Sequence, residues 1–278
     1  MSGDVGAEEG YEDRLVAFID ILGFADLIKG SRGDQAVLNT VRAALNEVAR
    51  ARAEWSAFVL KRNGQDMPLA LRSHAFSDSI IISDLAAQGA LPLFRAIAEI
   101  CFALFKHGSL TRGAVSRGPL YHDSTSAFGT SLINAYELEQ KVSHSPRILL
   151  TDGVHLACNL EFVFPGAGGQ FMVRELCLRD ADGLEYLDWL SLLLRHPEMF
   201  FLATDARGLV VDGLRSGIAQ VCTRIQSETR YGVRAKQGWF VRYFNRTVAQ
   251  YDYARELVVE PIPRPALIRN EEIGSSGS

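Results

Sequence analysis

Short apolar runs alternate along the chain with longer segments of helical periodicity. The runs at residues 14–21, 110–118 and 147–151 have the length and apolar content of buried strands. The segment 90–107 places apolar residues at the spacing of an amphipathic helix, and residues 130–142, which follow a polar loop and Gly129, are predicted to form a further helix. Together with two hairpins, this alternation predicts the order βα-ββ-αβ-αβ, a plait of strands and helices rather than a Rossmann order.

Both hairpins are predicted from strand-like segments that flank turn-forming residues. Residues 72–77 and 79–83 flank a tight turn that contains Asp78, and residues 171–178 and 185–189 flank an Asp-Gly dipeptide. The first strand is not followed by a GxGxxG motif, and the sequence contains no GxxxxGK[ST] motif. We therefore expect neither a dinucleotide-binding fold nor a P-loop.

The pattern changes after about residue 190, where residues 209–254 show a continuous helical periodicity. We predict a main domain at 13–195 and a helical C-terminal extension at 196–268. Residues 1–12 are predicted to be a disordered N-terminus, and 269–278 a flexible tail rich in Gly and Ser.

Composition narrows the class of protein. A chain of 278 residues with 47% hydrophobic content can bury a full core. Its net charge of −4, without a basic stripe, argues against a nucleic-acid-binding surface. The sequence shows no apolar signal region and no stretch near the roughly 20 apolar residues of a membrane span. Its four cysteines are scattered. We therefore expect a soluble, cytoplasmic protein.

Two aspartates stand where apolar strands give way to small or turn-forming residues. Asp20 interrupts the first apolar run, and Asp78 lies in the turn of the first hairpin. Burying an acid among apolar residues costs several kcal/mol unless a partner offsets it. Two such acids brought together repel each other, and a divalent cation relieves that repulsion. The alternative is that each aspartate only caps the element that follows it.

Four segments that follow one another along the chain form a more specific pattern than any one of them. Residues 18–24, Phe-Ile-Asp-Ile-Leu-Gly-Phe, resemble the Phe-x-Asp-Ile-x-Gly-Phe signature of class III nucleotidyl cyclases, and residues 77–78 resemble that family's second metal-binding Gly-Asp. Residues 112–118 resemble the strand that follows, and 128–139 the Gly-x-x-x-Asn-x-Ala-x-Arg-Leu helix. The resemblance covers roughly residues 13–190. It implies an α+β fold with a ferredoxin-like βαββαβ core, additional strands and the C-terminal helical extension.

The resemblance also implies a two-metal site for a nucleoside triphosphate. Two Mg²⁺ or Mn²⁺ ions would be held by Asp20, Asp78 and the backbone carbonyl of Ile21. One ion would activate the ribose 3′-hydroxyl for attack on the α-phosphate, and the other would stabilise the leaving pyrophosphate. Backbone N–H groups at Gly23 and Phe24, where a helix is expected to begin, would receive phosphate oxygens.

The chain departs from the family pattern at four positions. Counting from the helix glycine, the family's transition-state Asn and Arg correspond to Ile133 and Glu137. The purine-selecting Lys corresponds to His74 and its partner Asp to Ser126. Because base selection depends on matched hydrogen bonds, this site should not read adenine well. The combination is similar to the pyrimidine cyclases of the bacterial Pycsar anti-phage system, which make cyclic UMP or cyclic CMP from UTP or CTP. The alternatives are a purine cyclase and a catalytically inactive cyclase-fold protein.

Other side chains could replace the missing groups. Arg72 and His74 lie two residues apart on one predicted strand and therefore share a face, so both could meet the base or the phosphates. Arg117 and Lys141 are candidates to bring positive charge to the phosphates, although each could equally be a solvated surface residue. The resemblance further implies a homodimer with two sites at its interface and a separate effector that responds to the cyclic nucleotide.

Overall fold

The computed structural model describes residues 10–30, 70–159, 170–201 and 203–260, and in addition parts of 34–50 and the short strands near 60–67 and 161–163. Most of the predicted N-terminal segment and the whole of the predicted tail lie outside the described residues. The helices and strands are β1 (Glu12–Ile21), α1 (Phe24–Gly30), β2 (Leu60–Arg62), β3 (Gln65–Met67), β4 (Arg72–Phe76), β5 (Ser79–Leu85), α3 (Leu91–Phe105), β6 (Thr111–His122), β7 (Ala127–Phe128), α4 (Thr130–Val142), β8 (Ile148–Leu150), α5 (Asp152–Cys158), β9 (Glu161–Val163), β10 (Gln170–Met172), β11 (Cys177–Arg179), β12 (Glu185–Leu187), α6 (Trp189–Arg195), α7 (Ala206–Ser227) and α8 (Tyr231–Val248).

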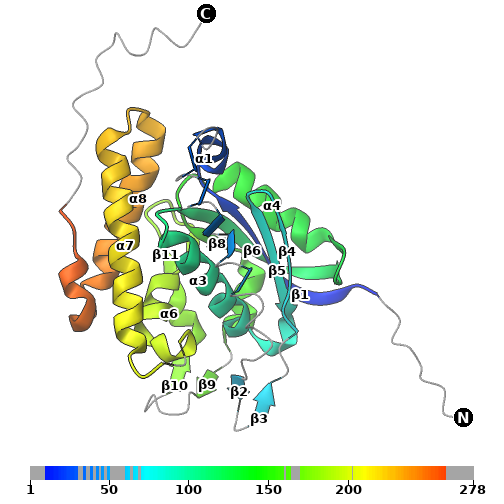
Figure 1. The fold of residues 1–278 in the computed structure, drawn as a ribbon. Helices are drawn as coiled ribbons and strands as arrows, with labels where there is room; N and C mark the ends of the chain where they lie inside the picture. The colour runs from blue at the N-terminus through cyan, green and yellow to red at the C-terminus, as the bar shows by residue number, and fades with distance from the viewer. Residues whose placement is uncertain are drawn as a thin grey trace, which may run out of the picture.

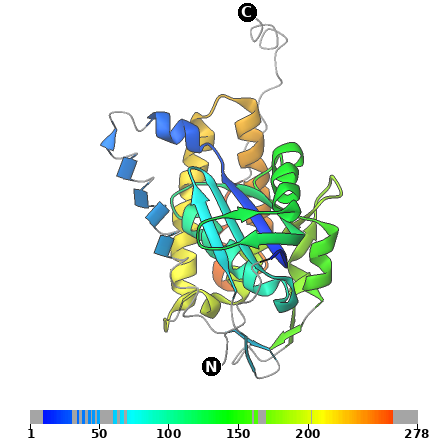
Figure 2. The ribbon, with the colours of Figure 1, turned by 90° about the vertical axis from the view of Figure 1, so that its right-hand side faces the viewer.

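A mixed sheet forms the centre of the molecule, with the strand order β11-β12-β8-β6-β1-β5-β4. Within the row β6-β1-β5-β4, each strand is antiparallel to the next, whereas β8 runs parallel to β6. Figure 2 shows the blue β1 beside the cyan hairpin of β4 and β5. The fold is therefore α+β, as the sequence predicts.

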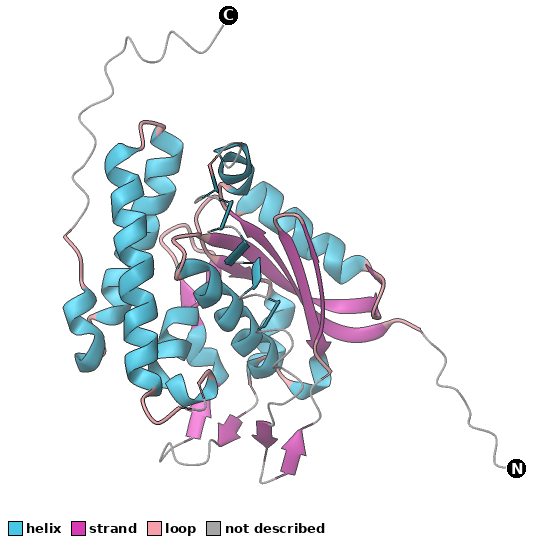
Figure 3. Ribbon diagram, in the orientation of Figure 1, coloured by secondary structure: helices cyan, strands magenta, loops and turns pink. Residues whose placement is uncertain are grey.

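Side chains along β1 point alternately to two differently covered faces of the sheet. Leu15, Ala17 and Ile19 belong to the main hydrophobic core, which also contains most of α3. Val16 and Phe18 point the other way and pack with Ala135 of α4. Figures 1 and 3 show α3, α7 and α8 on one side of the sheet and α4 on the other. This alternation is the period of two that an extended strand imposes.

The helices after residue 195 share the main core with the sheet. Phe105 of α3 packs against Phe240 and Phe244 of α8, with ring centroids 5.1 and 5.9 Å apart. Buried side chains of α7, including Leu214 and Ile218, complete the same core. The residues before and after the predicted boundary near residue 195 therefore pack into one continuous hydrophobic core.

The prediction of a continuous helical pattern over 209–254 is wrong. The structure has two helices, α7 and α8, with Glu228 and Arg230 in extended backbone conformations between them. The Glu228 side chain accepts a 2.8 Å hydrogen bond from the Arg230 backbone N–H, a local bond that competes with the helix. A single helix of that length would be about 70 Å long, and only a turn lets both apolar faces reach α3.

The first predicted hairpin is confirmed, since β4 and β5 pair from Phe76 and Ser79 onward. The second is shorter than predicted. Residues 173–176 form a 3₁₀ turn, so the pairing of β11 with β12 begins only at Cys177. In the part of the chain that the structure describes, no helix has the length and apolar character needed to cross a membrane.

Candidate active site

The structure brings Asp20 and Asp78 to the same end of the sheet. Asp20 lies near the end of β1, paired with Ser79 of β5 on one side and Arg112 of β6 on the other. The next residue, Ile21, donates a 2.9 Å backbone hydrogen bond to the carbonyl oxygen of Asp78. Burial is the largest cause of the raised pKa of Asp20, and the negative charge of Asp78 raises it further. The two carboxylates therefore act on each other electrostatically.

The turn that carries Asp78 has an unusual backbone. Ser77 and Asp78 are the two residues between the paired Phe76 and Ser79. Among the non-glycine residues that the structure describes, Ser77 is the one with positive φ, at 55°. Two-residue hairpin turns require such a conformation, which costs a non-glycine residue about 1 kcal/mol. The tight turn fixes Asp78 next to the end of β1.

Two residues absent from the sequence-based site complete this cluster. Arg112 donates a hydrogen bond from Nε to Asp20 Oδ2 at 3.3 Å, and one from Nη1 to the Ser143 carbonyl oxygen at 3.4 Å. The same Nε lies 2.5 Å from Glu139 Oε1 of α4. One guanidinium thus lies between two carboxylates from different elements.

Glu139 is a fully buried acid, with 0% of its surface exposed. It follows Ser131 and Ala135 at intervals of four, so these three buried residues form the line along which α4 meets the sheet. Burial is the largest cause of the raised pKa of Glu139; Arg112 lowers this pKa, whereas Asp20 and Asp78 raise it. The interval of four in the sequence could have indicated that Glu139 faces inward, but not that it meets Arg112.

The donor atoms at this end of the sheet suit a hard divalent cation. The described residues contain no group of three or more His, Cys, Asp and Glu side chains arranged to hold a metal. Asp20 and Asp78 would supply two carboxylates, and the Ile21 carbonyl follows Asp20 directly in the chain. Oxygen ligands of this kind favour Mg²⁺ or Mn²⁺ over zinc. The residues fit such ions provided that substrate oxygens or water complete the coordination.

The predicted phosphate-binding residues follow Asp20 closely. Gly23 has φ of 75° and turns the chain from β1 into α1, which begins at Phe24. A side chain at Gly23 would meet no atom within 4 Å, so positive φ rather than crowding explains the glycine. Gly23 and Phe24 therefore lie at the same end of the sheet as the two aspartates.

The predicted base-reading residues Arg72 and His74 belong to a separate polar network. His74 Nδ1 lies 2.8 Å from His122 Nε2, and His122 Nδ1 lies 2.7 Å from the hydroxyl oxygen of the buried Ser83. Arg72 donates to the His122 carbonyl oxygen and lies 3.6 Å from Glu12. In the strand register, His74 is paired with Ile81 of β5, whereas Asp20 is paired with Ser79 of the same strand. His74 therefore lies two residues, or about 7 Å, further along the strand than Asp20.

The remaining predicted residues are not brought to Asp20 within one chain. Arg117 binds Asp13 at 2.7 Å and lies five residues beyond Arg112 on β6, which places it on the opposite face of the sheet. Lys141 is an exposed residue of α4 that pairs with Glu137 at 3.1 Å. Ser126 lies in the exposed turn between β6 and β7, where its N–H binds Asp123 Oδ1 at 2.7 Å.

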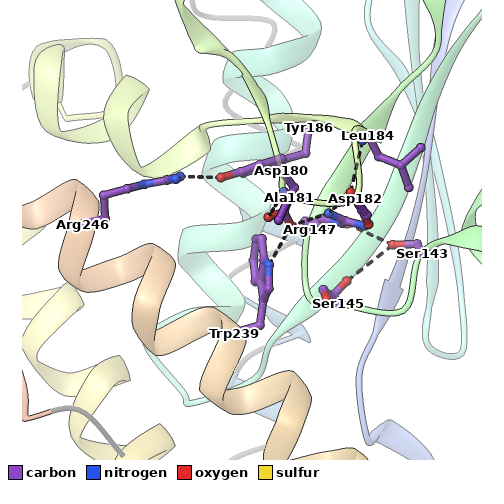
Figure 4. Close-up of polar contacts among 10 residues, drawn as sticks. All are labelled: Ser143, Ser145, Arg147, Asp180, Ala181, Asp182, Leu184, Tyr186, Trp239 and Arg246. Atoms are coloured by element: carbon purple, nitrogen blue, oxygen red, sulfur yellow. Dashed lines mark hydrogen bonds and ion pairs between the residues drawn. The ribbon is translucent and has the colours of Figure 1, made fainter.

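Polar contacts hold the C-terminal helix α8 close to the end of the sheet that carries Asp20 and Asp78. Arg147, just before β8, forms ion pairs with Asp180 and Asp182 of the loop between β11 and β12. Trp239 of α8 donates from Nε1 to Asp180 at 2.8 Å, and Figure 4 shows the indole directed toward Asp180, next to Arg147. The positive charge of Lys236, one turn before Trp239, lowers the pKa of Asp20. The extension therefore contributes to the electrostatics of the carboxylate cluster.

Comparison with known proteins gives no match, since neither a protein-family model nor a curated protein matches this chain.

Proposed function

We propose that this chain is a pyrimidine nucleotide cyclase. It would convert UTP or CTP into the 3′,5′-cyclic monophosphate and pyrophosphate. The observation that carries the proposal is the meeting of Asp20 with Asp78 at one end of β1, joined by the hydrogen bond from Ile21 to the Asp78 carbonyl oxygen. The resemblance to class III cyclases requires this meeting, and an isolated capping role for each aspartate does not.

The strand order supports the same proposal. Leaving aside the segment between α1 and β4, which includes the short strands β2 and β3, the elements β1, α1, β4, β5, α3 and β6 follow one another as β-α-β-β-α-β. Their strands lie side by side in the antiparallel order β6-β1-β5-β4. This order is the one expected of the split arrangement of a ferredoxin-like core. Residues 12–122 would then form that core within the proposed catalytic domain at 13–195, with the later strands and helices added around it.

The residues around Asp20 would have separate tasks in this reaction. Asp20, Asp78 and the Ile21 carbonyl would hold the two Mg²⁺ or Mn²⁺ ions. When bound, these ions lower the pKa of the ribose 3′-hydroxyl and stabilise the leaving pyrophosphate. Arg112, beside Asp20, is placed to offset negative charge on the phosphates. Backbone N–H groups at Gly23 and Phe24 would bind phosphate oxygens.

The choice of a pyrimidine follows from what the base-reading positions contain. His74 is bound to His122, and Ser126 lies in an exposed turn bound to Asp123. Neither offers the paired Lys and Asp with which the purine cyclases read their base. The resemblance to the pyrimidine cyclases of the Pycsar system further implies that the cyclic product is a second messenger for anti-phage defence. It would be formed at two sites of a homodimer and would act on a separate effector.

The test is to incubate the purified protein with Mn²⁺ and each of the four nucleoside triphosphates separately, and to identify the products by mass spectrometry. We expect cyclic UMP or cyclic CMP together with pyrophosphate, and no product from Asp78→Asn. This variant is a suitable control because the Asp78 backbone carbonyl that binds Ile21 is retained. Cyclisation by Asp78→Asn at the wild-type rate would reject the metal assignment.

One observation favours a second function, that of an inactive nucleotide-binding protein. Arg112 already offers a positive charge to Asp20, the place that a divalent cation would take. An inactive protein would bind a nucleoside triphosphate without turning it over. Binding measured by calorimetry, without a cyclic product from any of the four nucleotides, would support this alternative.

A further inference from the structure

The guanidinium of Arg112 is shared unequally between its two carboxylates. Its Nε–H forms a hydrogen bond with Asp20 at 3.3 Å, whereas Glu139 Oε1 is closer, at 2.5 Å, but lies outside hydrogen-bond geometry. The single N–H group thus points toward the more distant acid. A small rotation of the guanidinium would direct it to Glu139 instead.

Glu139 depends on this arginine more strongly than Asp20 does. Its side chain is 0% exposed, and its other oxygen, Oε2, accepts a 2.6 Å hydrogen bond from the neutral Gln140. Its ion pair is with the guanidinium of Arg112. Asp20, with 16% of its side chain exposed, can instead receive a cation from solvent. An ionised carboxylate that is fully buried requires a paired partner, so separating Arg112 from Glu139 should cost more than separating it from Asp20.

We infer that Arg112 pairs with Asp20 in the cation-free protein and transfers this hydrogen bond to Glu139 when a divalent cation binds Asp20. This inference rests on the proposed function, because it takes Asp20 as a metal ligand. Glu139 retains the guanidinium after the exchange, and the Ser143 carbonyl oxygen, 3.4 Å from Nη1, holds its other end. Arg112 therefore stays beside the site as a fixed positive charge.

The exchange makes Arg112 a competitor of the cation and makes Glu139 the residue that weakens this competition. Removing Arg112 should tighten cation binding. Removing Glu139 should weaken it, because the guanidinium would then pair fully with Asp20. Glu139 could also act only as a nearby negative charge, in which case its removal would weaken binding whether Arg112 is present or absent. A double-mutant cycle separates these two roles.

The experiment is a calorimetric titration of the full chain with Mn²⁺ alone. The proteins compared are wild type, Arg112→Gln, Glu139→Gln and the double variant. We expect Arg112→Gln to bind Mn²⁺ about tenfold more tightly than wild type, because the positive charge that competes for Asp20 is removed. We expect Glu139→Gln to bind Mn²⁺ about tenfold more weakly, because Arg112 is then released to pair fully with Asp20. In the Arg112→Gln background, Glu139→Gln should change the affinity less than about threefold.

A matched control exists on α7, where the exposed Arg215 also bridges two carboxylates, Asp212 and Glu256. Arg215→Gln should leave Mn²⁺ affinity unchanged. If Arg112→Gln does not fold because Glu139 is left unpaired, the comparison of the charge-balanced double variant with Glu139→Gln still applies, and the double variant should bind at least tenfold more tightly.

Equal Mn²⁺ affinities of the double variant and of Glu139→Gln would overturn the inference. It would also be overturned if Glu139→Gln weakened Mn²⁺ binding equally in the wild-type and Arg112→Gln backgrounds. Absence of Mn²⁺ binding by every protein, including wild type, would also overturn it. Failure of the proposed function looks different: Mn²⁺ binds with the expected ratios, but wild type forms no cyclic nucleotide.

Discussion

Arg112 of β6 lies directly opposite Asp20 of β1 in the antiparallel sheet, and its Nε is 3.3 Å from Asp20 Oδ2. This pairing places a positive charge at the carboxylate that we propose as a metal ligand. It also links the sheet to α4, because the same nitrogen contacts Glu139. The candidate site is therefore a cluster of three acids and one arginine rather than two aspartates alone.

The first prediction concerns the two aspartates. Asp20→Ala and Asp78→Ala should each reduce cyclisation to below a few per cent of wild type, because each change removes about half of the carboxylate charge available to the ions. Both variants should still fold, since neither side chain belongs to the hydrophobic core. Product formation with Mn²⁺ and circular dichroism would check this. Substantial activity in both variants would reject the two-metal site.

The second prediction concerns the positive charge that supports the transition state. Arg112→Lys should lower kcat by roughly 10²-fold with less effect on KM, because lysine retains the charge but not the planar fork of donors. Within one chain, Arg117 and Lys141 pair with Asp13 and Glu137 instead. Replacing Arg117 or Lys141 by Ala should lower kcat by a similar factor only if that side chain reaches the phosphates from the second chain of a dimer. Steady-state kinetics would decide, and an unchanged kcat in Arg112→Lys would exclude its role.

The third prediction concerns the base. A purine should find two of its polar groups without partners, because His74 and Ser126 replace the family's Lys and Asp. An unmet hydrogen bond costs about 1–3 kcal/mol, so two of them should disfavour purines by about a hundredfold or more in kcat/KM. UTP is expected to be the better of the two pyrimidine substrates. If ATP or GTP reacted as fast as UTP and CTP, the argument from these positions would be wrong.

The fourth prediction concerns acid stability. Burial, followed by the charges of His74 and Arg14, lowers the pKa of His122 from 6.5 to about 4. As the pH falls through this interval, the unfolded chain takes up the proton first, so folding stability is lost from about pH 6.5 down to about pH 4. The loss should be on the order of 3 kcal/mol.

His122→Asn lacks this proton uptake. The free energy of unfolding of wild type relative to this variant should therefore decrease by that amount between about pH 7 and pH 4, as measured by urea denaturation. A difference that stays constant across this range would show that His122 does not titrate on unfolding.

Local patterns were sufficient for the elements that hold the two aspartates. An apolar run predicts β1, and a polar turn between two strand-like segments predicts the hairpin around Asp78, because neighbouring residues fix both features. The helix predicted over 130–142 has the same bounds as α4. Its signal is also local: a polar loop that ends at Gly129, directly before the first residue of the helix.

Contacts between distant residues could not be read in this way. Arg112 and Asp20 are 92 residues apart and meet only through the register of β1 with β6, which the packing of the whole sheet sets. His74 and His122, 48 residues apart, meet because the end of β6 approaches β4. The fold-back of α8 onto α3 likewise depends on burying both apolar helix faces in one core. The sequence by itself determined the strands, the turn and their two acids, whereas tertiary packing alone decided which charges surround them.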